Sequence, residues 1–358
     1  MRVRLISYED VNEWILGKFV LRMREDLLKM GIEADIAKVP DPTADINHHV
    51  IYEQFDGIKS NHDTLMITHI DSIDKLNHLK AVINNVSYGI CMSKDTMQKL
   101  IALGLPKEHL CYVDPAQDGD FMPRKIQVGY TSRWYADGRK REYLLRDLAY
   151  HLDNQFFAFK FMGSGWDKII NLFRAKGFEV DYIPEFDLSK YKKLMSEIDY
   201  YLYTGLDEGQ MGFVDALAAG CKTIVTPQGY HLDVKDGITH SFIDSKDLLK
   251  IFDDILEEKA KRIRSVSNWT WTNYTLKHLE IWNHILGNEV KLLGGISYID
   301  GIHSILDADE ELDVSTYNVQ SLRKKLYLHG MRRKLFVKFN YYFSKNFLYN
   351  LKRKLFKQ

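Results

Sequence analysis

The chain alternates short apolar runs with longer segments in which apolar residues recur every three or four positions. Four strands are predicted in its first third: Val3 to Ser7, His49 to Phe55, Thr64 to His69 and Ser87 to Met92. Helical spacing runs from Asn12 to Met30 and from Lys94 to Leu103, and a glycine follows each segment. Strands that alternate with helices in this way predict a parallel, doubly wound sheet.

A second series of the same kind begins after a break near Asp114. Its predicted strands are Gln127 to Thr131, Phe157 to Met162, Phe178 to Ile183, the run ending at Tyr203, and Lys222 to Thr226. Before the last strand, a short helix is predicted from Phe213 to Ala219, where Gly220 can adopt the left-handed cap. Two such series predict two α/β domains, which suits a chain of 358 residues.

Composition narrows the class of protein. Apolar residues make up 45% of the chain, yet no apolar run approaches the roughly 20 residues of a membrane span. The N-terminus enters a strand without the apolar stretch of a signal peptide. Cys91, Cys111 and Cys221 are scattered, without metal-ligand spacing. We therefore expect buried thiols in a reducing cytoplasm and no metal site.

The most informative segment is the loop before the predicted helix at Phe213. Three glycines, Gly205, Gly209 and Gly212, punctuate it around Asp207 and Glu208. A glycine-rich turn that leads from a parallel strand into a helix N-terminus is where open α/β sheets bind phosphorylated ligands. The free N–H groups suit a phosphate and the carboxylates suit hydroxyls, so the segment indicates a sugar nucleotide.

The same segment, EGQMGFVDALAAG, resembles the signature of the group 1 glycosyl transferases (glycosyltransferase family 4), which have the two-domain GT-B fold. The matching pairs are Glu208-Gly209, Asp215-Ala216 and Ala219-Gly220. The second acid is Asp where the family has Glu, and the spacing from Glu208 is one residue short. Asp207 restores the spacing but lacks the adjacent glycine, so the first acidic role stays open between Asp207 and Glu208.

Two further segments carry the resemblance. DPAQDGDFMPRK, starting at Asp114, is similar to the family's interdomain linker, and SNWTWTNYTLKHLEIWNHI, starting at Ser267, is similar to its tryptophan-bearing helix that crosses back to the first domain. The implied organisation is a Rossmann-like acceptor-side domain over residues 1–122 and a nucleotide-sugar-binding domain over 123–266, with the two facing a cleft. The crossing helix covers 267–287, and an extension covers 288–358.

The resemblance also implies how the donor is held. Arg133, at a strand end, and Lys140, at the start of the following helix, would neutralise the diphosphate, with Arg139 a rival for the second cation. Donor-side backbone would come from the Gly163 and Gly165 turn. In the acidic loop, Asp207 or Glu208 would bond the sugar hydroxyls and Asp215 the ribose, because a carboxylate accepts two hydroxyl hydrogens. The donor-binding set is completed by Gly209, Gln210, Met211 and Gly212.

Acceptor residues are expected in the first domain. His69 lies at the end of a predicted strand with Asp71 beside it, and a histidine there could bond the sugar or accept a proton near neutral pH. Asn12 lies where relatives carry a glycine-rich loop, although no glycine pair is present here. A retaining transfer would need no protein base, because the leaving phosphate can take the acceptor's proton, and inversion with Asp71 or His69 as base is the alternative.

The charge of the chain is unevenly distributed. Net charge is zero, but residues 321–358 contain 12 Lys and Arg and no Asp or Glu. From Met331 to Leu355 apolar residues recur every fourth position, while Lys334, Lys338, Lys345 and Lys352 share another sector. This predicts a basic amphipathic helix that lies on an anionic membrane surface. The alternative is a terminal helix packed on the acidic body of the protein, and nucleic acid is not expected as a partner.

Together these features predict a glycosyltransferase of hexosyltransferase type, peripheral at the cytoplasmic face of the membrane. Its donor would be a nucleoside diphosphate sugar and its acceptor a saccharide or lipid-linked molecule, in cell-surface polysaccharide or glycolipid synthesis. No cofactor is expected. Two alternatives remain: a GT-B sugar-nucleotide epimerase, and a non-catalytic sugar-nucleotide binder that serves as an assembly partner.

Overall fold

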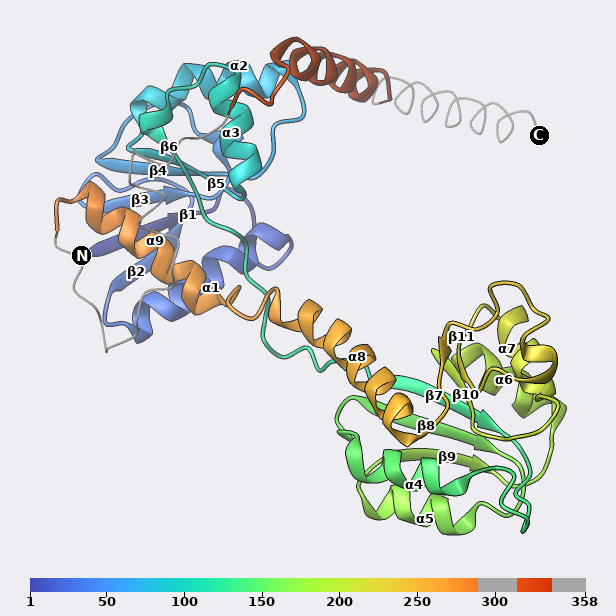
Figure 1. Ribbon diagram of the computed structural model, residues 1–358. Helices are drawn as coiled ribbons and strands as arrows, with labels where there is room; N and C mark the ends of the chain where they lie inside the picture. The colour runs from blue at the N-terminus through green and yellow to red at the C-terminus, as the bar shows by residue number, and fades with distance from the viewer. Residues whose placement is uncertain (289–313, 337–358) are drawn as a thin grey trace, which may run out of the picture. The chain divides into compact units, whose positions relative to one another are not determined.

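The computed structural model describes residues 1–288 and 314–336. The chain forms two compact units, Met1–Gly119 with the residues from Asn268 onward, and Asp120–Ser267. These are called the first and second unit below. Each unit contains a six-stranded parallel sheet with helices on both faces (Figure 1). The predicted fold class, α/β with two doubly wound Rossmann-like domains, is confirmed.

The sheet of the first unit has the strand order β2-β1-β3-β4-β5-β6. Its strands are β1 (Arg2–Ile6), β2 (Glu33–Ala37), β3 (Ile46–His49), β4 (His62–Ile67), β5 (Tyr88–Cys91) and β6 (Leu110–Tyr112). Its helices are α1 (Ile15–Lys29), α2 (Ile73–Val82), α3 (Lys94–Ala102) and α9 (Trp271–Ile285). The chain passes from one half of the sheet to the other between β1 and β3, which makes their carboxyl ends the switch point of this unit.

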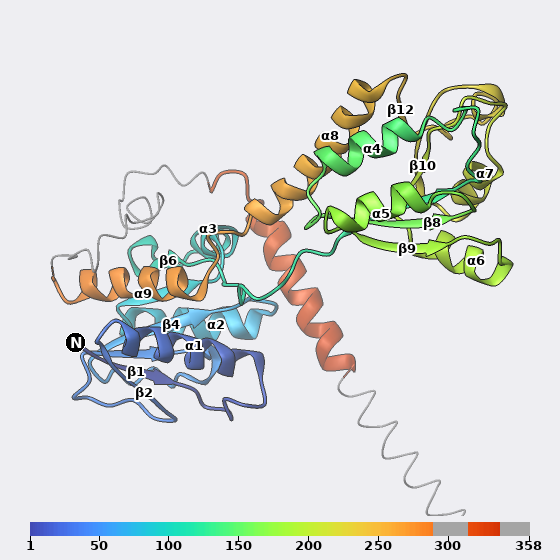
Figure 2. The same cartoon turned by 90° about the horizontal axis from the view of Figure 1, so that it is seen from below.

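Helices cover both faces of this sheet. On one face α1 and α9 pack together (Figure 2). Phe19 of α1 meets Trp271 and Tyr274 of α9 edge to face, at ring centroid distances of 5.1 and 5.5 Å. On the other face α2 and α3 bury Leu79 and Leu100 in a separate apolar cluster. The tryptophan-bearing helix α9 therefore belongs to the core of the first unit, although it follows the second unit in sequence.

One predicted strand of the first unit was wrong. The strand expected from His49 to Phe55 ends at its first residue, because β3 is Ile46–His49 and Tyr52–Gln54 form a 3₁₀ helix, η1. The three polar residues of β3, Asn47, His48 and His49, are all 0% exposed. Each of the three side chains has a hydrogen-bond partner in the protein, such as the Thr64 hydroxyl for His48 Nδ1 and the Asp63 carboxylate for His49. A strand with this composition cannot be recognised from its hydropathy.

The second unit has the strand order β12-β11-β10-β7-β8-β9. Its strands are β7 (Ile126–Thr131), β8 (Phe157–Met162), β9 (Glu179–Ile183), β10 (Tyr200–Tyr203), β11 (Lys222–Val225) and β12 (His240–Ser241). Its helices are α4 (Glu142–His151), α5 (Asp167–Ala175), α6 (Leu188–Glu197), α7 (Met211–Ala218) and α8 (Ser245–Arg264). Here the switch point lies between β7 and β10, which are neighbours in the sheet but distant in sequence.

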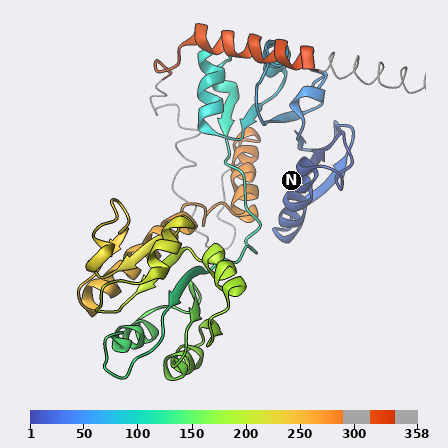
Figure 3. The ribbon, with the colours of Figure 1, turned by 90° about the vertical axis from the view of Figure 1, so that its right-hand side faces the viewer.

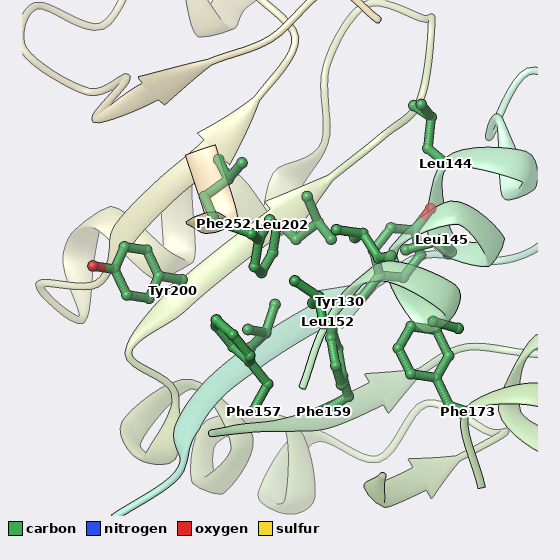
Figure 4. Packing of buried hydrophobic residues seen from close by; sticks show 14 of the residues in the cluster. Tyr130, Leu144, Leu145, Leu152, Phe157, Phe159, Phe173, Tyr200, Leu202 and Phe252 are labelled. Atoms are coloured by element: carbon green, nitrogen blue, oxygen red, sulfur yellow. The ribbon is translucent and has the colours of Figure 1, made fainter. Parts of the chain in front are cut away.

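Aromatic side chains dominate the core of the second unit. Phe157, Phe159 and Phe173 pack with α4 and α8 on one face of the sheet, and Figure 4 shows this cluster from close by. The rings of Phe159 and Phe173 have centroids 4.4 Å apart. The opposite face is covered by α6 and α7, whose Leu194 and Phe213 share a second cluster. Packing on both faces fixes the carboxyl edge of the sheet, from which the loops of the candidate site project.

The basic C-terminal segment is described only in part. Residues 319–336 are helical, and Val319, Leu322 and Leu326 pack against the cluster formed by α2 and α3. This agrees with the alternative of a helix packed on the body, while the predicted amphipathic helix beyond residue 336 lies outside the described residues. In the described ranges, no helix has the length and apolar character needed to cross a bilayer.

Candidate functional site

A concave site of the second unit lies at the switch point of its sheet. A pocket of ≈ 1140 Å³ is lined by residues that follow β7, β8, β9 and β10, together with side chains of α6 and α7. Loops at the carboxyl ends of these four strands meet there because parallel strands all end at the same edge. This is the position at which open α/β sheets bind their ligands.

Arg133 supplies a cation to this pocket. It follows β7, its side chain is exposed, and its guanidinium carbon lies 5.9 Å from the ring centre of Tyr135. In residues 1–288 and 314–336, Arg133 forms no ion pair, so its charge is available to an anion. Lys192 of α6 also lines the pocket and is a second cation that the sequence analysis missed. It sits on a helix whose sequence shows no glycine or strand-end signal.

Gly163 allows two loops to approach each other beside Arg133. Its φ is +127°, and a Cβ at this position would lie 2.1 Å from the backbone oxygen of Ser132. The same oxygen accepts a hydrogen bond from the buried Trp166 indole at 2.6 Å. The turn is therefore held close to Arg133, and Gly163 lines the pocket. Gly165 does not line the pocket; its φ is +90° and it lies against Trp134.

The N-terminus of α7 forms the opposite wall. Gln210, Met211 and Gly212 line the pocket, and the amides of Met211 and Gly212 have no hydrogen-bond partner in the described chain, whereas the Phe213 amide donates to the Gln210 carbonyl. Gln210 donates to the Thr131 carbonyl at 2.9 Å, which holds the helix start against β7. A Cβ on Gly212 would lie 2.3 Å from the Tyr201 hydroxyl, so only glycine permits this approach. The helix N-terminus and Arg133 together suit a phosphate group.

Asp215 reaches the same pocket from one turn further along α7. Its Oδ2 accepts a hydrogen bond from the Tyr191 hydroxyl at 2.6 Å. Burial, reinforced by this bond and the nearby carboxylate charge, raises the pKa of Tyr191, so the phenol stays protonated and keeps donating. The other carboxylate oxygen of Asp215 forms no hydrogen bond within the described residues and can accept ligand hydroxyls.

Lys140 and Asp207 face each other and do not line the pocket. Lys140 is 4% exposed, and its ammonium lies 2.7 Å from Asp207 Oδ2 and 2.5 Å from the Tyr203 hydroxyl. Tyr203 in turn donates to Asp207 at 2.6 Å. Burial opposes ionisation of Asp207, but the bonds from Lys140 and Tyr203 outweigh it, so the pKa of the carboxyl is lowered. The three residues form a charged cluster beneath the acidic loop.

The neighbouring cations are also engaged elsewhere. Arg139 pairs with Asp137 at 2.5 Å. Arg141 is buried, adopts a φ of 46°, and donates to the carbonyls of Thr204 and Ile243. The group Arg139 to Arg141 precedes α4 instead of starting it. Of the cations that the sequence associated with the diphosphate, the pocket gathers Arg133 alone.

Glu208 is the exposed acid of the loop. In the described residues its side chain has no ion pair, and its backbone oxygen accepts the amide of Tyr230 at 3.2 Å. Gly209 has a φ of +125°, and a Cβ there would lie 2.7 Å from the Tyr230 ring. Neither residue lines the pocket as it stands. Glu208 is thus free to meet a ligand, whereas Asp207 is held inside the loop.

Beneath the loop lies His231, which the sequence analysis missed. It is 0% exposed, its Nδ1 contacts the Thr226 carbonyl at 3.2 Å, and its Nε2 accepts the Gln210 amide at 3.2 Å. Desolvation lowers the pKa of His231, which keeps the acceptor nitrogen unprotonated. The residue supports the start of α7 and carried no spacing signal in the sequence.

In the first unit, the structure brings His69 and Asp71 together after β4. His69 Nε2 lies 3.5 Å from Asp71 and 3.2 Å from the ammonium of Lys75, which contacts Asp71 at 3.2 Å. Burial alone would raise the pKa of Asp71, but the hydrogen bond and charge of Lys75, with the other positive charges nearby, have the larger effect. The pKa of Asp71 is therefore lowered. Asn12 lies in the turn before α1, where its amide bonds Asp10 at 2.8 Å.

A second polar chain lies at the switch point of the first unit. The Tyr8 hydroxyl meets His49 Nδ1 at 2.8 Å, and His49 Nε2 meets the buried Asp63 carboxylate at 2.9 Å. Burial, with the charges of Asp56 and Asp63, raises the pKa of Tyr8 to about 12. Asp63 holds the orientation of His49, and His49 holds Tyr8.

No group of three or more possible metal ligands occurs in the ranges that the structure covers.

Comparison with known proteins gives structural similarity only. No protein-family model and no curated protein matches the chain. Among solved structures, the chain is similar to Anabaena HepE in complex with UDP and glucose (13% identity, 79% of this chain and 100% of that one, TM-score 0.32). It is also similar to a glycosyltransferase from Rickettsia africae (12% identity, 80% and 99%, TM-score 0.31). A third is the catalytic domain of the Helicobacter pylori cholesterol-α-glucosyltransferase (16% identity, 44% and 99%, TM-score 0.32). Identity and TM-score are low throughout, so the similarity carries no functional argument.

Proposed function

We propose that the protein is a glycosyltransferase that binds a nucleoside diphosphate sugar in the pocket of the second unit. The observation that carries this proposal is that Arg133 and the N-terminus of α7 line one pocket at the switch point of the sheet. A fixed cation and a row of unpaired amides are what a metal-independent site needs to hold a diphosphate.

The groups around the pocket suit the other parts of such a donor. Asp215 bonds the ribose hydroxyls, with Tyr191 keeping its carboxylate in place. Lys192 adds a second positive charge on the side of α6. Glu208, exposed on the loop, bonds the hydroxyls of the transferred sugar. Asp207 is instead paired with Lys140, which supports giving the sugar-binding role to Glu208.

In the reaction, the acceptor oxygen forms a bond to the anomeric carbon of the sugar while the bond from that carbon to the diphosphate breaks. The diphosphate leaves with the electron pair of the broken bond. Arg133 and the amides of Met211 and Gly212 stabilise the charge that develops on it. The acceptor's proton passes to the leaving phosphate in a retaining, hexosyl-transferring reaction, which requires neither a protein base nor a cofactor.

The acceptor is a saccharide or a lipid-linked molecule at the cytoplasmic face of the membrane. The basic segment over residues 321–358 supports this part of the proposal, because its 12 cations are attracted to anionic lipid headgroups. Such a location suits an enzyme of cell-surface polysaccharide or glycolipid synthesis.

The experiment is a donor screen that measures release of free nucleoside diphosphate from UDP-, GDP- and ADP-sugars, with and without membrane extract. Arg133→Ala should reduce the rate by about 10²–10³ while leaving the fold intact, because one preorganised cation is lost. Arg146→Ala is the matched control, since Arg146 is exposed on α4 and does not line the pocket. Equal rates for the two folded variants would remove the diphosphate assignment.

A non-catalytic sugar-nucleotide binder is the second candidate. It is favoured by the pairing of Lys140 with Asp207, which leaves one cation fewer at the diphosphate than the sequence predicted. In that case nucleotide binding would depend on Arg133, but no donor would release nucleoside diphosphate under any condition of the screen. An epimerase would convert the donor without releasing its nucleotide.

A further inference from the structure

A second pocket, separate from the donor pocket, lies entirely within the first unit. It has a volume of ≈ 600 Å³ and is bounded by the loop after β4, by α3 and by the helical residues 319–336. This C-terminal helix lies against α2 and α3 (Figure 3). The volume falls within the range of small-molecule sites.

Apolar side chains form the floor of the pocket. Leu100 and Leu103, on and just after α3, are 1% and 3% exposed. Leu322 and Leu326 of the C-terminal helix pack against the same cluster and line the pocket from the other side. A cavity walled by leucines from two helices suits an aliphatic chain, whereas a free saccharide would leave its hydroxyls unpaired there.

The rim of the pocket is positively charged. Lys325 and Arg332 line it from the C-terminal helix, and neither forms an ion pair in the described part of the chain. Lys99 lines it from α3 and pairs with Asp95 at 2.5 Å. The one carboxylate of the lining, Asp71, is already matched by Lys75 and Arg333, each at 3.2 Å. The uncompensated charge at the rim is therefore positive.

The outer side of the C-terminal helix is also apolar. Tyr327, Met331 and Leu335, spaced four residues apart, are 60%, 43% and 60% exposed. They lie on one stripe of the helix because four residues advance it by slightly more than one turn. The same helix thus has leucines toward the pocket and an apolar stripe toward solvent, an arrangement that suits a helix lying at a lipid surface.

We propose that this pocket binds the lipid end of a lipid-linked acceptor. The hydrocarbon chain lies between α3 and the C-terminal helix, and the phosphate of the lipid is held by Lys325 and Arg332. His69 and Asp71 line the same pocket, so the head of the lipid is held beside the residues expected to handle the acceptor. The statement that the bound lipid is an acceptor rests on the proposed function. The lipid-binding site itself rests on the pocket alone.

The test uses the full chain and three probes: farnesyl phosphate, farnesol and inorganic phosphate, each titrated by calorimetry. Farnesyl phosphate should bind, farnesol should bind about tenfold more weakly or worse, and inorganic phosphate should not bind detectably. Lys325→Glu combined with Arg332→Glu should weaken farnesyl phosphate by about tenfold or more. The matched control is Arg323→Glu combined with Lys324→Glu, which reverses two charges on the same helix outside the pocket and should change the affinity little.

A second pair of variants tests the hydrocarbon part. Leu328 lines the pocket and is 44% exposed, so Leu328→Trp can fold and should reduce farnesyl phosphate affinity by filling the space. Leu335→Trp, on the exposed stripe, should leave the affinity unchanged. A photoreactive farnesyl phosphate should cross-link to α3 or residues 319–336. Absence of binding, equal effects of target and control variants, or cross-links confined to other peptides would each overturn the proposal.

The nucleotide screen separates this inference from the proposed function. Nucleoside diphosphate release by the wild-type protein, measured without any lipid, reports on the donor pocket alone, because all residues that line this pocket belong to the second unit. Donor turnover without farnesyl phosphate binding would reject the lipid site and keep the glycosyltransferase. Specific farnesyl phosphate binding without donor turnover would keep the site and reject the enzyme.

Discussion

The ammonium of Lys140 lies 2.7 Å from the Asp207 carboxylate, and both groups reach the Tyr203 hydroxyl beneath the acidic loop. The lysine side chain is 5% exposed and the aspartate side chain 25%. A cation buried this deeply depends on its partner, because an unpaired charge in the interior is costly. The pair therefore holds the loop on which Glu208 is displayed.

Replacing the two acids of the loop should have different effects. Asp207→Ala should lower the free energy of unfolding by about 1–3 kcal/mol, because it leaves the buried Lys140 without its carboxylate and the Tyr203 hydroxyl without an acceptor. Glu208→Ala should leave stability unchanged, because its side chain is exposed, and should reduce transfer. Urea unfolding and donor turnover, measured on both variants, separate the two effects.

Tyr203→Phe serves as the control for this comparison, since it removes one bond of the cluster and keeps the ion pair. It should fall between wild type and Asp207→Ala in stability. If Asp207→Ala were as stable as wild type yet inactive, Asp207 would be the sugar-binding acid and the two roles would be exchanged.

The parts of the site that sequence could predict are those governed by local rules. Arg133, Gly163 and the start of α7 each have a signal in the adjacent sequence. Arg133 follows a predicted strand, Gly163 belongs to a glycine turn after the next strand, and α7 follows a glycine-rich loop. The pairing of Lys140 with Asp207 joins residues far apart in sequence, so no local pattern indicates it. Lys192 was missed for the same reason.

The strands show the same difference between features set by local sequence and features set by tertiary contacts. Strands with apolar patterns, such as β7 and β8, were predicted within a residue or two of their bounds. β3 was misplaced because Asn47, His48 and His49 are buried with their own hydrogen-bond partners. Burial of a polar strand depends on tertiary partners such as Asp63, which hydropathy cannot reveal.

Donor turnover should survive chelation. In the proposed site Arg133, Lys192 and the amides of α7 neutralise the diphosphate, so no divalent ion is needed. We expect the same rate in EDTA as in buffer containing Mg²⁺ or Mn²⁺. Arg133→Ala measured under both conditions is the control, because a metal would compensate partly for the lost cation. Complete loss of turnover in EDTA, restored by either ion, would contradict the assignment.

Stability should fall in mild acid because of two buried histidines. His48 and His278 are both 0% exposed, with ring centres 5.1 Å apart. Burial lowers the pKa of His278 to about 4, and burial with the neighbouring His278 and His49 lowers the pKa of His48 well below its usual range. In the unfolded chain both titrate near 6.5. Below that pH the unfolded state therefore takes up protons that the folded state excludes.

The loss should begin as the pH falls below about 6.5 and continue toward about 4, and the contribution of His278 at pH 5 should be roughly 2 kcal/mol. His278→Phe should reduce the difference in urea unfolding between pH 7 and pH 5. His284→Phe, at an exposed position of the same helix, should keep it. A wild-type protein equally stable at both pH values would show that these histidines do not control the acid response.

Two truncations should separate membrane binding from packing in the basic segment. Removal of residues 337–358 leaves Leu322 and Leu326 in place against α2 and α3, together with the Arg333–Asp71 ion pair of 3.2 Å. We expect this protein to keep its stability and to sediment poorly with anionic vesicles, because most of the predicted amphipathic helix is gone. Removal of residues 321–358 should in addition cost about 2–4 kcal/mol, since both leucines are lost from the cluster.

The measurements are vesicle sedimentation and urea unfolding of the two truncated proteins beside the full chain. The charge control is the full chain carrying three substitutions together, Lys338→Glu, Lys345→Glu and Lys352→Glu. They should weaken sedimentation without altering stability, because anionic headgroups repel the reversed charges. Salt should release the wild-type protein only partly, since screening leaves the apolar contact with the bilayer intact. If the protein that ends at residue 336 sediments as fully as the full chain, the predicted membrane helix is not the anchor, and packing on α2 and α3 is the main role of the segment.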